Sequence, residues 1–177
     1  MQNSSHDHVP VSPWVERWLP GIAAAGEVLD LACGSGRHSR LLAATGRRVC
    51  ALDRDSGALG LLAGAPGITV MQADLEHAPW PLASRKFDGV VVTNYLHRPL
   101  FPCIIDAIAP QGLLIYETFA AGNERFGKPS NPEFLLRPGE LLELVAGRLR
   151  VIAFEDMEVS LPRPAMVQRI CARQFAA

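Results

Sequence analysis

The chain has 177 residues, 49% hydrophobic and 20% charged, which is enough apolar sequence to bury the core of one ordinary domain and excludes an intrinsically disordered chain. Seventeen lysines and arginines against 18 acids give a formal net charge of −1, which offers no support for nucleic-acid binding through bulk charge. No apolar run approaches the ~20 residues of a membrane-spanning helix. We therefore expect a single domain over residues 1–177, in which residues 1–26 form an N-terminal tail and a short helix.

The residues that most often bind metals form no recognisable site. The four cysteines are Cys33, Cys50, Cys103 and Cys171. They are scattered, without the C-x-x-C pairs of a zinc or redox centre, and we expect no metal. His6, Asp7 and His8 are interpreted as a solvated terminus. The N-terminal stretch MQNSSHDHVPVSP lacks the apolar core of a signal peptide, so we expect a cytoplasmic protein.

The predicted elements alternate between strands and helices along most of the chain. In chain order they are strand 27–32, helix 36–46, strand 48–53, helix 55–64, strand 68–74, strand 87–94, helix 99–109, strand 112–119 and helix 137–147. Apolar runs rich in β-branched residues, such as FDGVVVTN, are typical of parallel strands covered on both faces. The pattern predicts an α/β fold with a doubly wound, Rossmann-like sheet.

The C-terminal part departs from this alternation. Residues 148–159 and 165–175 are two strands joined by the short connection SLPRP, which predicts an antiparallel hairpin at the edge of the sheet. The longest irregular stretch is 120–134, and long loops in compact domains are usually functional or mobile. With glycines at both Gly122 and Gly127, this stretch is a candidate lid; a rigid surface connection is the alternative.

A glycine turn follows the first strand, where ligands bind in open α/β sheets. Gly34 and Gly36 allow the backbone to approach a ligand closely, and the helix that follows offers unpaired N–H groups. Asp53, 17 residues after Gly36, ends the second strand. Its carboxylate suits the two vicinal hydroxyls of a ribose, and a helix N-cap is the alternative.

Two nucleotide cofactors fit this turn. The segment nearly matches the G-x-G-x-x-G fingerprint of dinucleotide-binding proteins, with Ser39 at the last position. Asp30, just ahead of the glycines, would repel a pyrophosphate and would attract the ammonium group of a methionine moiety. The sequence therefore favours S-adenosylmethionine over a nicotinamide dinucleotide, although Asp30 could also act as a capping acid.

The stretch VLDLACGSG resembles the first motif, D-x-x-x-G-x-G, of the class I S-adenosylmethionine-dependent methyltransferases. The following residues are most similar to the branch that contains tellurite-resistance and ubiquinone-biosynthesis methyltransferases. The resemblance implies a seven-stranded sheet with one antiparallel strand, and a role for Asp74 as acceptor from the adenine amino group. The predicted cofactor-binding residues are Asp30, Ala32, Cys33, Gly34, Gly36, Asp53, Arg54, Asp74, Leu75 and Asn94.

The acceptor side of the site is predicted at the end of the fourth strand, in TNYLHRP. Asn94 and Tyr95 are placed to line the cofactor or the substrate. Tyr95 and His97 are the candidate catalytic residues, His97 as a general base, with a packing or capping histidine as the alternative. Arg98 could contact an anionic substrate or lie on the surface. The segment lacks the N-P-P-Y type of motif, which argues against DNA or protein glutamine as acceptor.

We predict an enzyme that transfers a methyl group from S-adenosylmethionine, with S-adenosylhomocysteine as product, to a small-molecule acceptor. An RNA methyltransferase, a non-catalytic cofactor-binding subunit and, least favoured, a nicotinamide-dependent oxidoreductase are the alternatives. Nucleic acid as a partner has no support from net charge, and no membrane association is expected. The sequence does not predict which small molecule is the acceptor, which of its atoms is methylated, or the oligomeric state.

Overall fold

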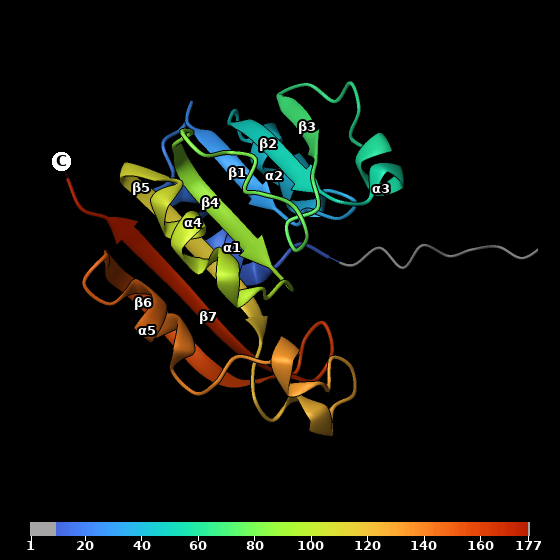
Figure 1. Cartoon of the computed structure of the whole chain (residues 1–177), viewed down its shortest axis with the longest axis vertical. Helices are drawn as coiled ribbons and strands as arrows, with labels where there is room; N and C mark the ends of the chain where they lie inside the picture. Colours follow the sequence, from blue (N-terminus) through green and yellow to red (C-terminus); the bar gives the residue numbers. More distant parts are fainter. Residues whose placement is uncertain (1–9, 177) are drawn as a thin grey trace, which may run out of the picture.

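A computed structural model describes residues 10–176, built around one seven-stranded sheet with the strand order β3-β2-β1-β4-β5-β7-β6 (Figure 1). The strands are β1 (Glu27–Leu31), β2 (Arg48–Asp53), β3 (Ile68–Gln72), β4 (Phe87–Thr93), β5 (Ile108–Phe119), β6 (Leu149–Val159) and β7 (Ala165–Gln174). β7 runs antiparallel to both of its neighbours, and the five strands from β3 to β5 are parallel. The predicted mostly parallel sheet with an antiparallel C-terminal hairpin is confirmed.

Helices cover both faces of the sheet. They are α1 (Pro13–Trp18), α2 (Arg37–Ala44), α3 (Ser56–Gly60), α4 (Phe101–Asp106) and α5 (Glu140–Val145), with 3-10 turns η1 (Leu19–Gly21), η2 (Arg98–Leu100), η3 (Asn123–Arg125) and η4 (Pro132–Phe134). Buried side chains of α1 and α2 form one core with one face of the strands. Those of α4 and α5 form a second core on the opposite face. The apolar runs of the strands therefore have a packing partner on each side.

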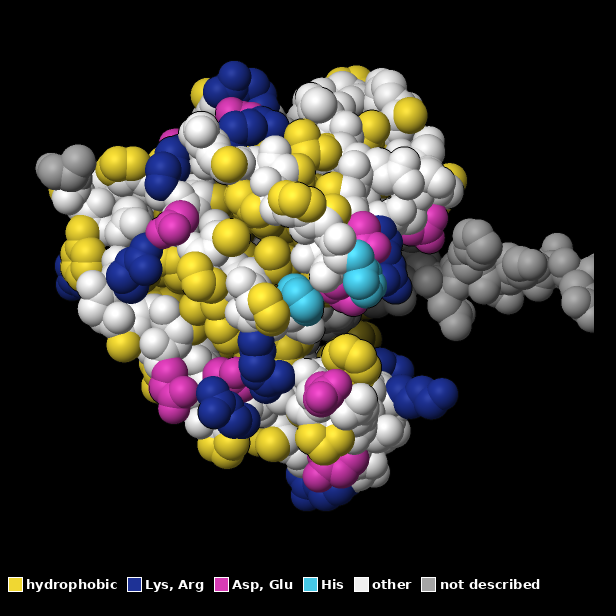
Figure 2. All heavy atoms as spheres, in the orientation of Figure 1, with side chains coloured by type: hydrophobic (Ala, Val, Ile, Leu, Met, Phe, Trp, Pro, Cys, Tyr) yellow, Lys and Arg dark blue, Asp and Glu magenta, His cyan; other side chains and the backbone are white. Residues whose placement is uncertain are grey.

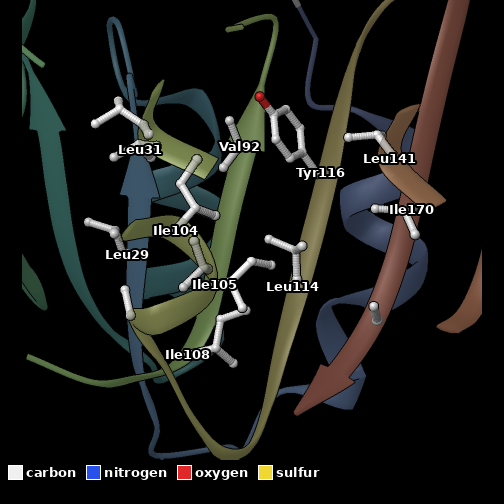
Figure 3. Close-up of a cluster of buried hydrophobic side chains, with 14 of the residues drawn as sticks. Leu29, Leu31, Val92, Ile104, Ile105, Ile108, Leu114, Tyr116, Leu141 and Ile170 are labelled. Atoms are coloured by element: carbon white, nitrogen blue, oxygen red, sulfur yellow. The ribbon is translucent and has the colours of Figure 1, made fainter. Parts of the chain in front are cut away.

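The second core joins residues that lie far apart in the sequence (Figure 3). Ile104 and Ile105 of α4 extend over β1, β4 and β5, and Leu141 of α5 lies beside Ile170 of β7. Burial of each such aliphatic side chain is worth roughly 1.5–3 kcal/mol. On the face drawn in Figure 2, hydrophobic side chains gather in the middle and charged ones lie mostly around them. Among residues 10–176 there is no helix long and apolar enough to cross a membrane.

The two predicted boundaries around Pro110 are wrong. The helix expected over 99–109 ends at Asp106, and β5 begins at Ile108. Pairing of β4 with β5 shifts between Phe87 and Gly89, so Pro110 lies in an irregular stretch of the ladder, where its missing N–H is tolerated. The other predicted helices are also shorter than expected, since α3 is Ser56–Gly60 and α5 is Glu140–Val145.

The connection from β3 to β4, residues 73–86, consists of turns without a helix. Pro79 and Pro81 lie two residues apart in this segment, and a proline inside a helix removes a hydrogen bond and clashes with the preceding turn. Because β1 to β5 are parallel, the segments that follow these strands meet at one edge of the sheet (Figure 1). All the predicted site residues lie on or next to this edge.

Candidate active site

The glycine turn after β1 has a left-handed backbone at three positions: Ala32, Gly34 and Gly36, with φ angles of 53°, 54° and 77°. A Cβ added to Gly34 would meet nothing within 4 Å, so this glycine leaves open space for a ligand. A Cβ added to Gly36 would lie 2.3 Å from a methyl carbon of Leu62. The two glycines therefore have different roles, since Gly34 keeps the approach to the backbone open and Gly36 permits close packing.

Asp30 lies beneath this turn and is only 1% exposed. Its Oδ2 accepts a hydrogen bond of 2.6 Å from the Ser39 hydroxyl, and its carboxylate also accepts from the Ser39 backbone N–H. Ser39 is in the first turn of α2, whose N-cap, Gly36, has no capping side chain. Burial raises the pKa of Asp30 to about 6 in spite of these bonds. The capping role weighed in the sequence analysis is present, and the attraction of an ammonium group stays a prediction.

Asp53 links the end of β2 to the glycine turn. Its Oδ2 accepts a hydrogen bond of 2.8 Å from the Gly34 N–H, and its Oδ1 accepts from Asp55 N at 2.9 Å. The alternative interpretation of Asp53 as a helix N-cap is wrong, because Asp55 caps α3 through Gly57 N and Ala58 N. A carboxylate has about four acceptor positions, so Asp53 keeps capacity for two further donors such as ribose hydroxyls.

A cleft of about 160 Å³, the inner cleft, opens beside these residues. It is lined by Ala32, Asp53, Arg54, Ala73, Asp74, Leu75, Glu76 and Tyr95. Five of the predicted cofactor residues therefore lie around one space, at the ends of three parallel strands. Cys33 is half-buried in the turn, with its N–H bonded to Leu52 O, and burial raises the pKa of its thiol.

Asp74 shapes the turn that follows β3. Its Oδ1 accepts hydrogen bonds from the backbone N–H groups of Glu76 at 2.9 Å and His77 at 3.2 Å, and the His77 ring is 3.1 Å from Oδ2. The hydrogen bond from Glu76 N, together with the bonds from His77, holds the pKa of Asp74 below its ordinary value. An ionised acceptor therefore faces the inner cleft at the position predicted for the adenine amino group.

A second space, the outer pocket, has a volume of about 270 Å³. It is lined by Glu76, Asn94, Tyr95, Leu96, Thr118, Phe119, Pro129 and Phe134. Asn94, which has a left-handed backbone (φ 55°), lines this pocket and not the inner cleft. Glu76 and Tyr95 line both spaces, so the inner cleft and the outer pocket meet at these two side chains.

Of the two predicted catalytic residues, only Tyr95 lies at this junction. Burial, with a smaller contribution from Glu76, raises the pKa of Tyr95 to about 12, so the phenol stays protonated and can donate a hydrogen bond. Its oxygen is buried without a partner among the described residues. His97 precedes η2 and lines neither space.

Arg98 does not contact a substrate site. Its Nε and Nη2 donate to the two carboxylate oxygens of Glu140 at 2.6 and 2.9 Å, and its guanidinium also donates to the carbonyls of Glu133 and Leu135. This residue therefore holds the segment that carries Phe134 against the end of β4. The predicted contact with an anionic substrate is wrong, because all of these donors serve the fold.

His38 is a residue of this edge that the sequence analysis missed. It is 2% exposed, its Nε2 accepts a hydrogen bond of 3.0 Å from Ser12 N, and its Nδ1 lies 3.2 Å from the Thr93 hydroxyl. Burial, helped by Arg37, lowers the pKa of His38 to about 3. The neutral ring therefore carries its hydrogen on Nδ1 and donates it to Thr93. In the sequence, only the proximity of His38 to Gly36 could have indicated that this histidine lies at the edge of the sheet.

Candidate metal ligands do not gather in the described part of the chain. Among residues 10–176 there is no group of three or more His, Cys, Asp or Glu side chains that could hold a metal ion. The interpretation of His6, Asp7 and His8 concerns residues outside the described range.

Comparison with known proteins bears on both the fold and the glycine turn. Residues 28–112, which contain the turn and both acids that follow it, match a protein family described as a methyltransferase domain. YqeM of Bacillus subtilis (strain 168), a methyltransferase by name, is 25% identical in an alignment of 127 positions that covers 64% of this chain and 51% of YqeM. The chain thus spans about half the length of this curated relative.

Two solved structures show the likeness of the fold. TehB from Haemophilus influenzae aligns with a TM-score of 0.73 at 20% identity, over 91% of this chain and 61% of TehB. The 1,6-didemethyltoxoflavin-N1-methyltransferase of Burkholderia thailandensis, solved with 1,6-didemethyltoxoflavin and S-adenosylhomocysteine, aligns with a TM-score of 0.67 at 17% identity, over 92% of this chain and 77% of that one.

These findings confirm the predicted fold. The chain has the fold of S-adenosylmethionine-dependent methyltransferases, and residues 28–112 match a methyltransferase domain. The family match supports the predicted class and its cofactor, S-adenosylmethionine.

Proposed function

We propose that the protein binds S-adenosylmethionine in the inner cleft and transfers its methyl group to a small molecule held in the outer pocket. The observation that carries the proposal is the meeting of the two spaces at Glu76 and Tyr95. A methyl donor and its acceptor must lie within contact distance and away from bulk water, and two adjoining spaces provide that arrangement.

The residues around the inner cleft suit the donor. The open space at Gly34 admits a ligand against the backbone, Asp53 retains acceptors for ribose hydroxyls, and Asp74 presents a carboxylate to the adenine amino group. Arg54 and Leu75 supply the remaining side walls. Asp30 is too buried for direct contact, so we assign to it an electrostatic effect on the ammonium group and the stabilisation of the first turn of α2.

For methyl transfer the main task of the protein is to position the donor and the acceptor. When bound, S-adenosylmethionine supplies a methyl group that is already electrophilic. The outer pocket orients the acceptor, and the segment 120–134 shields it from water through Pro129 and Phe134. We assign to the Tyr95 ring the wall that donor and acceptor share, because Tyr95 lines both spaces. A base role for His97 requires that it act through a bridging group, since it lines neither space.

A small molecule suits the outer pocket better than RNA does. Glu76 is the only charged side chain among the lining residues, and a carboxylate at this position repels phosphate groups. The positive groups nearby are engaged with the protein, since Arg125 lies 3.7 Å from Glu158 and Arg163 extends over the Phe119 ring. The prediction of a small acceptor therefore rests on the charge of the pocket as well as on its volume.

Thermal unfolding with separate additions of S-adenosylhomocysteine and NADH tests the proposal. At about 100 times the dissociation constant, a ligand that binds only the folded protein adds ~2.7 kcal/mol, which is a rise of about 5–10 °C for a chain of this size. We expect this rise with S-adenosylhomocysteine alone, and its loss in Asp53→Asn. Glu16→Gln on α1, which is exposed and lines neither the inner cleft nor the outer pocket, is the matched control and should keep the rise. A rise with NADH alone, or with neither ligand, would contradict the proposal.

A further inference from the structure

The apolar walls of the outer pocket are mostly aromatic rings and a proline. Five of its lining residues are Leu96, Phe119, Pro129, Phe134 and the ring of Tyr95, three of which are aromatic. Flat aromatic and proline surfaces pack best against another flat ring. The volume of about 270 Å³ lies just below the ~300–1,000 Å³ of pockets for drug-sized ligands, so it suits one ring or two fused rings.

The polar groups of the pocket are Glu76, Asn94, Thr118 and the Tyr95 phenol, and Glu76 is the only one that carries a charge. The Glu76 side chain is 34% exposed, and its Oε2 lies 4.0 Å from the Arg54 Nη1, at the limit of an ion pair. The Glu76 backbone is fixed by its N–H bond to Asp74. The carboxylate therefore keeps acceptor positions for a donor inside the pocket.

Tyr95 lines both the inner cleft and the outer pocket, and its phenol oxygen is buried without a hydrogen-bond partner among residues 10–176. Its ring therefore counts among the walls of the pocket. Arg163 does not line the pocket, since it donates to Lys128 O and lies 5.8 Å from the centre of the Phe119 ring. Among the polar lining residues Glu76, Asn94 and Thr118, the one that can select by charge is Glu76, at the junction with the inner cleft.

We propose that the acceptor is a planar aromatic molecule with one or two rings that donates an N–H hydrogen bond to Glu76. This inference rests on the proposed function and names the substrate class of the same site. The apolar walls, the Tyr95 ring among them, bind the ring system of the acceptor, and Glu76 selects a neutral or cationic nitrogen against an anion. Hydrogen bonds to a charged group contribute about 1.5–3 kcal/mol, so this selection amounts to tenfold or more in affinity.

The test is calorimetric titration of the full chain, saturated with S-adenosylhomocysteine, with three bicyclic probes of similar size. They are 2-aminobenzimidazole, which has N–H donors, 2-methylbenzoxazole, which has none, and the anion benzofuran-2-carboxylate. We expect 2-aminobenzimidazole to bind at least tenfold more tightly than the other two. Equal affinities, tighter binding of the anion, or binding of none of the probes would overturn the inference.

Three variants test which residues cause the preference for 2-aminobenzimidazole. In Glu76→Gln the preference for 2-aminobenzimidazole over 2-methylbenzoxazole should fall below about threefold, and Glu16→Gln should keep it. Phe134→Ala should weaken the binding of both probes by a similar factor, because it removes part of the apolar wall and leaves the charge of Glu76 in place. An unchanged preference in Glu76→Gln would overturn the role of this residue. Failure of S-adenosylhomocysteine to bind the wild-type protein would remove the proposed function as well, whereas its binding without discrimination among the probes would remove only the acceptor class.

Discussion

The two buried ionisable groups at the carboxyl edge, Asp30 and His38, should have opposite effects on the pH dependence of stability. His38 has a pKa of about 3 in the folded protein against 6.5 ordinarily. Between these two pH values the unfolded chain therefore binds a proton at His38, and the folded chain does not. The contribution of His38 to the free energy of unfolding is present above pH 6.5 and is lost as the pH falls from 6.5 towards 3. The loss is about 1.4 kcal/mol per pH unit, or about 2 kcal/mol between pH 6.5 and 5.

Asp30 changes stability in the other direction. Its pKa is about 6 in the folded protein against 3.8 ordinarily, so between these values the folded chain holds a proton that the unfolded chain has lost. The contribution of Asp30 to the free energy of unfolding is fully present below pH 3.8 and is lost as the pH rises through 6. Between pH 6 and 5 acidification therefore adds about 1.4 kcal/mol. In the wild-type protein the two effects nearly cancel between pH 6 and 4.

Urea unfolding at pH 7.5, 6 and 5 separates the two residues. Relative to the wild-type protein, His38→Gln should gain about 2 kcal/mol between pH 7.5 and 5, and Asp30→Asn should lose about 1.4 kcal/mol. Differences from the wild type cancel the groups that titrate alike in all three proteins, and unchanged m-values would show that the unfolded states are comparable. Curves that run parallel to the wild type in both variants would refute the argument from burial.

Further predictions concern the turn, the ion pair and the long loop. Gly34→Ala should cost about 1–2 kcal/mol of stability and abolish the thermal shift with S-adenosylhomocysteine, whereas Gly36→Ala should cost about 3 kcal/mol or more because of its steric clash. Arg98→Ala should cost about 3 kcal/mol in urea unfolding, since it leaves the Glu140 carboxylate, 3% exposed, without its main partner; a cost below 1 kcal/mol would contradict this. If segment 120–134 closes over the site, S-adenosylhomocysteine should slow its limited proteolysis severalfold, and equal cleavage rates would count against a lid.

Much of the fold could be predicted from local sequence. Apolar or alternating runs of residues predicted the strands, and the absence of a helix between the last two runs predicted the hairpin. The boundaries around Pro110 could not be predicted in this way. They depend on how β4 and β5 pair, and the shift in that pairing is decided by packing between strands that are twenty residues apart.

The sequence by itself predicted as cofactor-binding five of the eight residues that line the inner cleft. Asp30 and Asp53 lie near the carboxyl ends of β1 and β2, and the glycine turn and Asp74 come just after strands. Parallel strands bring such positions to one edge whatever the rest of the chain does. Only the tertiary structure showed that Glu76 borders both spaces. Glu76 follows β3 and Tyr95 follows β4, and which side chains line a common pocket depends on packing between segments that are distant in the chain. No local pattern of residues records packing of that kind.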